Sequence, residues 1–401
     1  MLKHQPRAGG RRATPVDFVP AEVGAGEFKP RVRLVLAAAL LVLLMAVLYL
    51  VAWAIPARAA PVFTAIDPTD APDANLNGQC ASTHQGLCTL RAAVQEAEHA
   101  GGGEVILSAG YGPYQLTIPG GAEVDPNAAA NAPTSATGDL DISTSVTVTG
   151  AGADVSVIDG DDAVRVFDVH GGGFLRVRGV SIQNGKGDYD SATRHSHGGA
   201  IHNHGTLSLS ESVVADSASA ATWGGGGITN AGPIPNFPAA TARLQNVTVA
   251  KNSTDSNGGG IENGGDLRML NVTVAENTAL GQGGGIFTAG TTGPTNTIVA
   301  LNRGGNCATA GAGSVSSGGN NLDGDGTCKF AQTTDLQGDP GFEAGPFGVS
   351  GAPVFYALLA TSAAVDTGSP QVGFCPATDV RGVLRPQDGN GDGIALCDIG
   401  S

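Results

Sequence analysis

The clearest pattern in the chain is a short run of alternating apolar and polar residues that returns at a nearly constant interval. Its instances begin at Gly179, Glu211, Asn246, Asn271 and Asn296, which are 32, 35, 25 and 25 residues apart. Alternate residues of a strand point to opposite faces, so Val272 and Val274 are expected to face inward and Thr273 outward. A period near 25 residues is typical of stacked repeats. The pattern therefore predicts an all-β chain folded as a parallel β-helix, with three strands in each coil of about 25 residues.

A second phrase, a glycine run followed by Ile, a variable residue and Asn, precedes these strands. Asn203, Asn230 and Asn263 occupy the same place in three successive units. We expect their side-chain amides to hydrogen-bond one above another as a ladder inside a turn. Leucine-rich repeats have a similar period, but they require Leu at fixed positions where this chain has mostly Val and Ile. The 62 glycines and the 5% of aromatic residues also favour short strands joined by tight turns.

The ends of such a stack need covering, because raw strand edges and an open core would otherwise meet solvent. Thr89–Ala100 is predicted to be a capping helix, with Thr89 as its N-cap and Gly101 as its stop. The first strand is expected at Val105–Leu107. The predicted boundaries are an N-terminal cap at 60–110, β-helix repeats at 111–334 and, at the other end, a C-terminal module at 335–401, where the period is lost.

The first 59 residues predict export. A basic region at 1–33, expected in the cytoplasm, precedes an unbroken apolar run from Leu34 to Ile55, and Ala57-Arg58-Ala59 has the form of a signal-peptide cleavage site. This run is long enough to span a bilayer, whereas the apolar part of a signal peptide is usually about 7 to 15 residues. Residues 34–59 are therefore expected to be either a cleaved signal peptide or a signal-anchor transmembrane helix. The flanking Lys and Arg place the rest of the chain outside.

All six cysteines follow this segment: Cys80, Cys88, Cys307, Cys328, Cys375 and Cys397. An even count in an exported chain predicts disulfides. Pairing of neighbours along the chain (Cys80 with Cys88, Cys307 with Cys328, Cys375 with Cys397) is the simplest arrangement, although six cysteines allow about 15 connectivities.

The net charge limits which classes of partner are expected. The chain carries −15 overall, and the residues from 60 onward hold 13 basic and 33 acidic side chains. Such a surface repels nucleic acid, so DNA and RNA are not expected as partners. Membrane contact is expected only through residues 34–59, if they are retained. Carboxylate oxygens are preferred ligands of Ca²⁺, which makes Ca²⁺ the cofactor that the composition favours.

Several motifs resemble one group of exported bacterial proteins. The opening motif of CSLREA-type surface proteins resembles Asp70–Asn75 together with Cys88–Ala93. Late coils of the choice-of-anchor Q group resemble Asn296–Asn302 and the segments up to Cys328. The C-terminal module of that group resembles Ala363–Gly368, Thr378–Gly382 and Cys397–Gly400. The resemblance covers nearly everything from residue 64 onward. It implies a right-handed, pectin-lyase-like β-helix and no established activity. Unlike members of that group, this chain ends one residue after Cys-Asp-Ile-Gly.

Three sets of residues are candidates for chemistry. Polysaccharide hydrolysis needs converging carboxylates, for which the candidates are Asp159, Asp161 and Asp162. A polysaccharide lyase needs Ca²⁺ and a basic residue, and the candidate bases are Arg176 and Arg178. Imidazoles two residues apart on a strand face the same way, so His202 and His204 are candidate transition-metal ligands. The loop with Asp388, Asn390 and Asp392 resembles the start of a calcium loop but lacks its final Glu.

Exposed charges on a solenoid face would also explain the acidic residues, and a tolerant surface position would explain His202. We therefore expect a monomeric, exported cell-surface or secreted protein that binds a glycan or another surface without catalysis. The alternative is a polysaccharide lyase or glycoside hydrolase, of pectate-lyase or polygalacturonase type, that acts on an acidic polysaccharide.

Overall fold

The structure, a computed structural model, describes residues 59–120, 135–187, 198–220, 224–233, 238–343, 355–371 and 373–401, and in addition Leu40, Leu41, Leu43 and Met45. The chain forms two compact units, Met1–Ala59 and Ala60–Ser401. In the first unit the four described residues have helical backbone and exposed side chains. The rest of the predicted export segment, up to residue 58, lies outside the described residues. Within the described part of the chain, no helix has the length and apolar character needed to cross a bilayer.

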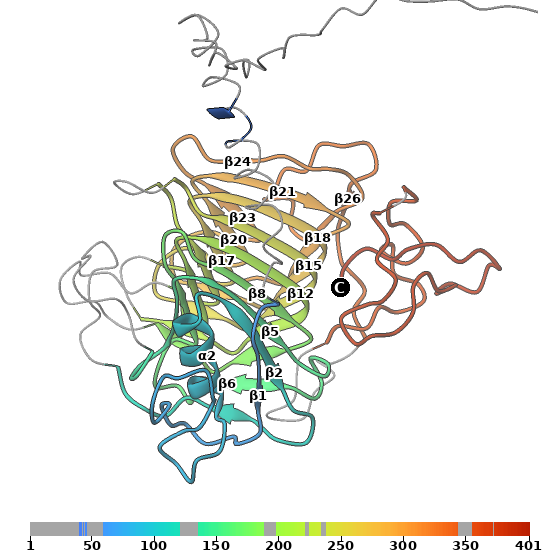
Figure 1. Ribbon diagram of the computed structural model, residues 1–401. Coiled ribbons are helices and arrows are strands. Elements are labelled where there is room, and N and C mark those ends of the chain that lie inside the picture. The colour runs from blue at the N-terminus through green and yellow to red at the C-terminus, as the bar shows by residue number, and fades with distance from the viewer. Residues whose placement is uncertain are drawn as a thin grey trace, which may run out of the picture. The chain divides into compact units, whose positions relative to one another are not determined.

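The second unit is a stack of coils whose strands pair with those of neighbouring coils (Figure 1). Every pairing between the strands named below is parallel, as in the pairs of β12 with β15 and of β15 with β18. The largest sheet, here the long sheet, contains β1 (Val62–Ala65), β2 (Gly103–Leu107), β3 (Tyr114–Gln115), β5 (Ser145–Thr149), β6 (Val157–Asp159), β8 (Phe174–Arg178), β9 (Ser181–Gln183), β12 (Thr206–Ala215), β15 (Thr241–Ala250), β18 (Asp266–Ala275), β21 (Thr291–Thr295), β22 (Ile298–Ala300), β24 (Ser314–Val315), β25 (Leu322–Asp323) and β26 (Leu336–Gln337).

Two smaller sheets complete the coils. The seven-stranded sheet contains β4 (Leu140–Ile142), β7 (Phe167–Val169), β11 (Ile201–Asn203), β14 (Ile228–Asn230), β17 (Ile261–Asn263), β20 (Ile286–Thr288) and β23 (Cys307–Thr309). The four-stranded sheet contains β10 (Lys186–Gly187), β13 (Ala218–Ser219), β16 (Ser253–Thr254) and β19 (Thr278–Ala279). The second unit is therefore a parallel β solenoid, which confirms the predicted all-β class.

The observed strand register has the same intervals as the sequence repeat. Val247 pairs with Val272, 25 residues later, and Ser212 pairs with Val247, 35 residues later. Val272 and Val274 are fully buried in the main core, whereas Thr273 faces the opposite side and receives a hydrogen bond from Ser401. The predicted inward stack of valines is thus confirmed.

The predicted asparagine ladder is also present. The Nδ2 group of Asn203 donates to Asn230 Oδ1 at 2.7 Å, and that of Asn230 donates to Asn263 Oδ1 at 2.8 Å. All three side chains are fully buried. A second ladder, which the sequence pattern did not single out, joins the buried amides of Asn252 and Asn277 at 3.0 Å. Each ladder satisfies polar groups that would otherwise be buried without partners.

The turns explain why glycine and asparagine recur at fixed places. A Cβ on Gly226 would collide with the carbonyl oxygens of Ser253 and Gly259 in the next coil, so only glycine allows the coils to approach there. Asn246 and Asn271 have φ of 53° and 52°, a left-handed conformation that bends the chain within β15 and β18. Asparagine tolerates this conformation better than most residues do.

The N-terminal end of the unit contains α2 (Leu90–His99), which packs beside β1 and β2 (Figure 1). Thr89 is its N-cap and accepts a hydrogen bond from the Ala92 backbone N–H at 3.1 Å, as predicted. Arg91 is fully buried and makes a bidentate ion pair with Asp70, with distances of 2.6 and 3.0 Å. The long sheet begins with β1, one strand before the strand that the sequence predicted as first. The prediction missed β1 because its four residues are too few to show a period.

The C-terminal residues from 355 onward lie along the side of the stack (Figure 1), whereas the sequence suggested a module at its end. They cover part of the outward face of β15, β18 and β22. Thr248 Oγ1 lies 2.8 Å from Ser401 Oγ, and Ile298 packs with Ala364 and Ile399. The outward side chains that lie under the segment, Thr248, Thr273 and Ile298, carry no charge, which suits them for burial by a second layer.

Three disulfides join Cys80 to Cys88, Cys307 to Cys328 and Cys375 to Cys397. The predicted local pairing is confirmed. Disulfides form and persist in oxidising compartments, so the second unit belongs to an extracellular or otherwise oxidising environment.

Candidate functional site

The outward face of the seven-stranded sheet carries a row of mostly polar side chains. The first six of its strands, from β4 to β20, each place their first and third residues in the core, so the middle residue points away. Strand register aligns these middle residues one per coil, in the order Asp141, Asp168, His202, Thr229, Glu262 and Phe287. We call these six residues the outer row. Its first three members place two carboxylates and an imidazole on neighbouring strands about 4.8 Å apart.

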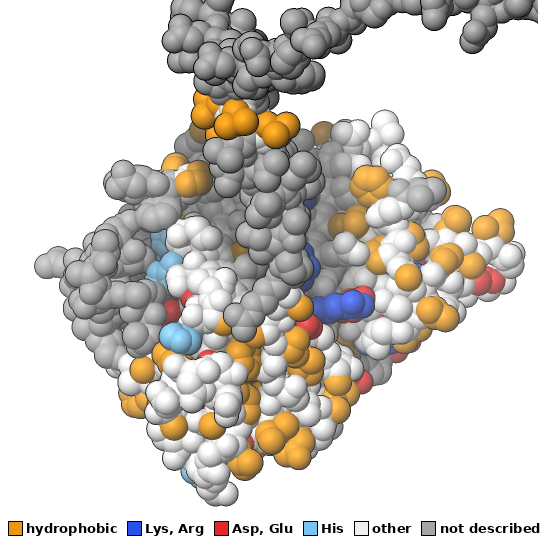
Figure 2. All heavy atoms as spheres, in the orientation of Figure 1, with side chains coloured by type: hydrophobic (Ala, Val, Ile, Leu, Met, Phe, Trp, Pro, Cys, Tyr) orange, Lys and Arg blue, Asp and Glu red, His pale blue; other side chains and the backbone are white. Residues whose placement is uncertain are grey.

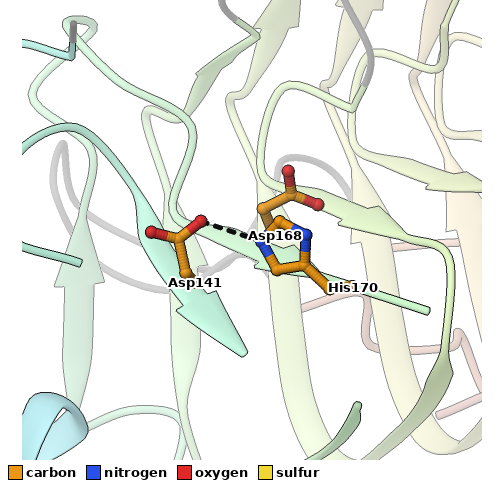
Figure 3. A group of neighbouring side chains, drawn as sticks. All are labelled: Asp141, Asp168 and His170. Atoms are coloured by element: carbon orange, nitrogen blue, oxygen red, sulfur yellow. Dashed lines mark hydrogen bonds and ion pairs between the residues drawn. The ribbon is translucent and has the colours of Figure 1, made fainter. Parts of the chain in front are cut away.

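At the start of the outer row, Asp141 and Asp168 converge with His170 (Figure 3). His170 follows Asp168 by two residues and therefore emerges on the same face. Its Nε2 lies 2.9 Å from Asp141 Oδ1, and the side chains of His170 and Asp141 are only 9% and 15% exposed. One ligand atom from each of the three residues lies within 4.8 Å of the other two. Among the described residues, these three side chains form a group that could hold a metal ion.

A buried arginine neutralises part of this cluster. Arg165 Nε contacts Asp139 Oδ2 at 2.7 Å, and its Nη2 lies 3.4 Å from Asp168 Oδ2. Burial by itself would raise the pKa of the Asp168 carboxyl, but the charges of Arg165 and His202 hold this pKa well below its ordinary value. Burial also disfavours protonation of His170, yet the hydrogen bond to Asp141 and the charge of Asp168 raise the pKa of this imidazole.

The predicted metal pair, His202 and His204, lies next to the cluster. Their rings meet edge to face with centroids 4.3 Å apart, and His202 Nδ1 lies 3.4 Å from Asp168 Oδ1. Burial lowers the pKa of His204. Sequence reasoning found these two histidines but missed His170 and Asp141, because the early coils lack the repeat phrase. Aligning the strands before Gly179 with β11 would have revealed the cluster.

The aspartates proposed for hydrolysis form a turn. The Asp159 carboxylate is buried and accepts hydrogen bonds from Asn184 Nδ2 at 3.0 and 3.1 Å. It also accepts one from the Asp161 backbone N–H at 2.8 Å, while the side chains of Asp161 and Asp162 are exposed. Among the described residues, no ion pair or hydrogen bond joins these three aspartates to Arg176. The turn thus accounts for Asp159 without a catalytic role.

A row of arginines lies on the outward face of the long sheet. Arg176 is in register with Ser208, Ser208 with Arg243 and Arg243 with Arg268, so four successive coils contribute to one line. We call Arg176, Arg243 and Arg268 the arginine row; all three side chains are exposed. Arg268 Nε lies 3.2 Å from Asp266 Oδ1, whereas within the described ranges neither of the other two is in an ion pair. Arg178, two residues further along β8, pairs with Glu211 at 2.8 Å.

The arginine row borders a groove of about 430 Å³ between the long sheet and the C-terminal segment. The groove is lined by residues that include Ser208, Arg243, Gln245, Arg268 and Phe374. In Figure 2, Lys and Arg side chains gather in the middle of the visible face, apart from the His side chains on its left. The two candidate sites are therefore separate: one acidic and histidine-rich and mostly buried, the other basic and open.

The loop proposed for Ca²⁺ is held by its own backbone. The Asp388 carboxylate accepts hydrogen bonds from the N–H groups of Gly391 and Gly393 at 2.8 and 2.9 Å. Asn390 Oδ1 accepts one from the Asp392 N–H at 2.9 Å. These bonds describe an ordinary polar turn, and Ca²⁺ binding at Asp388, Asn390 and Asp392 stays a prediction.

Comparison of the chain with family models, curated proteins and solved structures finds no match.

Proposed function

We propose that the chain is an exported cell-surface or secreted protein that binds an anionic glycan along the arginine row. In this proposal it belongs with the CSLREA and choice-of-anchor Q proteins, and its solenoid is a right-handed, pectin-lyase-like β-helix. The motif residues support this family, since Arg91 and Asp70 form the buried ion pair that ties α2 to the preceding loop. The disulfides and the apolar segment Leu34–Ile55 support export.

The arginine row is the observation that carries the proposal. Guanidinium groups bind carboxylate and sulfate groups in a bidentate manner, which gives both strength and geometric specificity. Arg243 and Arg268 stand on adjacent strands about 4.8 Å apart, with Arg176 two strands before Arg243. A linear polymer with repeated acidic groups could contact several coils at once. The open groove beside the row, with Gln245 in its wall, supplies polar contacts for sugar hydroxyls.

The net negative charge of the exported part does not oppose this proposal at contact range. Charges more than about 8 to 10 Å apart are largely screened at physiological ionic strength. Arg176 and Arg243, which have no carboxylate partner among the described residues, then dominate the field felt by a bound acidic group. The other acidic residues should lower the association rate more than they lower the affinity.

The test is a polysaccharide array probed with the full chain, solubilised in detergent, on which uronic-acid and sulfated polymers lie beside neutral glucans. We expect binding to the acidic polymers that weakens as salt rises. The double variant Arg243→Glu with Arg268→Glu should weaken it about tenfold or more. Arg303→Glu is the matched control, because Arg303 is exposed but lies by the four-stranded sheet.

Three results would overturn the proposal. Equal binding to neutral and acidic polymers, or equal loss in both variants, would exclude the arginine row as the binding site. Release of shortened or unsaturated sugars from a bound acidic polymer, measured with and without Ca²⁺, would instead establish the lyase or hydrolase alternative.

A further inference from the structure

We propose that Asp141, Asp168 and His170 form a binding site for one divalent transition-metal ion of the Zn²⁺ type. The site lies on the seven-stranded sheet, away from the arginine row, and the proposal is independent of glycan binding. It also differs from the pair of His202 and His204 that the sequence suggested.

Geometry is the first argument. The three residues come from two adjacent strands in fixed register, Asp141 on β4 opposite Asp168 on β7, with His170 two residues later. Bonds of about 2.1 Å to one Zn²⁺ ion place its ligand atoms roughly 3 to 4.2 Å apart. The observed ligand atoms lie within 4.8 Å of one another, so small side-chain rotations would bring them onto one ion. The contact of 2.9 Å between His170 and Asp141 already meets this requirement.

A poorly satisfied buried oxygen is the second argument. Asp168 is 5% exposed, and its Oδ1 atom accepts no hydrogen bond from the described residues. His202 Nδ1 lies 3.4 Å from this oxygen, which is too long for a good hydrogen bond. Buried carboxylate oxygens normally have partners. A metal ion beside Oδ1 would supply one.

Charge is the third argument. Asp139, Asp141 and Asp168 bring three carboxylates together, and Arg165 is the permanent cation that contacts two of them among the described residues. A divalent ion would balance the remaining negative charge.

The donor set indicates the class of ion. One imidazole and two carboxylates suit Zn²⁺, Mn²⁺ or Fe²⁺, whereas Ca²⁺ and Mg²⁺ prefer oxygen ligands alone. Three protein ligands leave a fourth position for water, as in sites where the metal performs chemistry. His202, beside Asp168 Oδ1, is placed to orient this carboxylate from the next coil.

Equilibrium dialysis of the full chain against Zn²⁺ alone, at pH 7 and after removal of metal with a chelator, tests the site. We expect one ion per chain at this site. His170→Gln and Asp168→Asn should each weaken its binding on the order of 10- to 100-fold. His99→Gln is the matched control, because His99 is exposed at the end of α2 and lies outside the cluster. Circular dichroism would show that each variant keeps the wild-type strand content.

X-ray absorption of the Zn²⁺-loaded wild-type chain keeps the test informative if a variant fails to fold. One imidazole with otherwise oxygen ligands is expected in the first coordination shell. Two or more imidazoles would show that the ion is held by other histidines, and the proposal would be wrong. Absence of binding, or equal binding by the wild type and His170→Gln, would show that the cluster is only a buried network of ion pairs.

Discussion

The two faces of β17 show how differently the solenoid constrains neighbouring residues. Asn263 points inward, is fully buried and takes part in an amide ladder that runs through three coils. Glu262, the residue before it, points outward and belongs to the outer row. In the coils on either side, the position of Glu262 is taken by Thr229 and Phe287, whereas the position of Asn263 is taken by Asn230 and Thr288.

This difference follows from stacking. An inward side chain touches the same position of the coils above and below, so its size and hydrogen-bonding groups must match both of them. An outward side chain has no such requirement. The outward positions of one regular backbone can therefore become a His and Asp cluster in the early coils and an arginine row on another sheet. The fold stays the same while the chemistry of its faces changes.

The largest predicted effect comes from breaking the inward ladder. Asn263 accepts from Asn230 Nδ2 at 2.8 Å and from the Gly265 N–H at 3.1 Å, and it donates to Thr288 Oγ1 at 3.0 Å. Asn263→Ala would leave several buried groups without partners, so we expect unfolding to become easier by about 3 to 4 kcal/mol. Urea unfolding followed by circular dichroism measures this. If Asn263→Ala lowers the free energy of unfolding as little as Glu262→Gln does at pH 5, inward and outward positions tolerate substitution equally.

A slightly smaller effect is expected where the C-terminal segment docks on the stack. Asn296 Nδ2 donates to the Phe374 carbonyl at 2.7 Å, and Asn296 Oδ1 accepts from the Ser369 N–H at 2.8 Å. Asn296→Ala should weaken docking by about 2 to 3 kcal/mol, because it removes both bonds and leaves Ala at a φ of 51°.

Limited proteolysis measures this docking, with faster cleavage expected after residue 355. Asn296→Gly removes the same hydrogen bonds but tolerates the left-handed backbone, so it separates the two causes. If neither variant alters the cleavage rate, the docked segment does not depend on Asn296.

Glu262 should make stability depend on pH. Burial raises the pKa of its carboxyl from 4.5 to about 7. The folded chain therefore keeps a proton that the unfolded chain loses above about pH 4.5. The stability that this proton contributes is full below pH 4.5 and is lost as pH rises through 7. Because the side chain retains some contact with solvent, we expect a loss of about 2 kcal/mol between pH 5 and 8.

Thermal unfolding of the wild type and Glu262→Gln across pH 5 to 8 checks this expectation. The Glu262→Gln variant should not lose this part of its stability, so the melting temperatures of the two proteins should diverge as pH rises from 5 toward 7 and stay apart above it. Parallel pH profiles would show that the Glu262 carboxyl titrates normally.

The same distinction explains what the sequence could predict. The inward pattern repeats, so the period, the buried valines and the ladder of Asn203, Asn230 and Asn263 could be derived from spacing alone. Disulfide pairing also followed, because each pair closes a short local loop. Outward residues repeat less regularly, as Glu262 between Thr229 and Phe287 shows. The cluster of Asp141 with His170 depends on register in coils that lack the phrase, and the arginine row spans strands whose sequences differ.

The side-on docking of the C-terminal segment was unpredictable for another reason. It depends on contacts between residues far apart in the sequence, such as Asn246 with Thr378, whose side-chain amide and carbonyl lie 2.6 Å apart. No period marks such pairs. From the sequence, the outward threonines of the repeat resemble ordinary solvent-facing residues, but in the structure Thr248 and Thr273 are buried under the segment.

The smallest predicted effect concerns an outward ion pair and sharpens the contrast. Arg178 and Glu211 are 2.8 Å apart, but the Arg178 side chain is 62% exposed, so the pair should contribute less than about 1 kcal/mol to stability. Glu211→Gln should therefore leave the urea midpoint nearly unchanged. If the arginine row binds acidic glycans, the freed Arg178 should strengthen this binding about twofold at low salt, and the gain should disappear at high salt. A marked loss of stability would mean that this outward position is constrained like an inward one, and the distinction between the two faces would fail there.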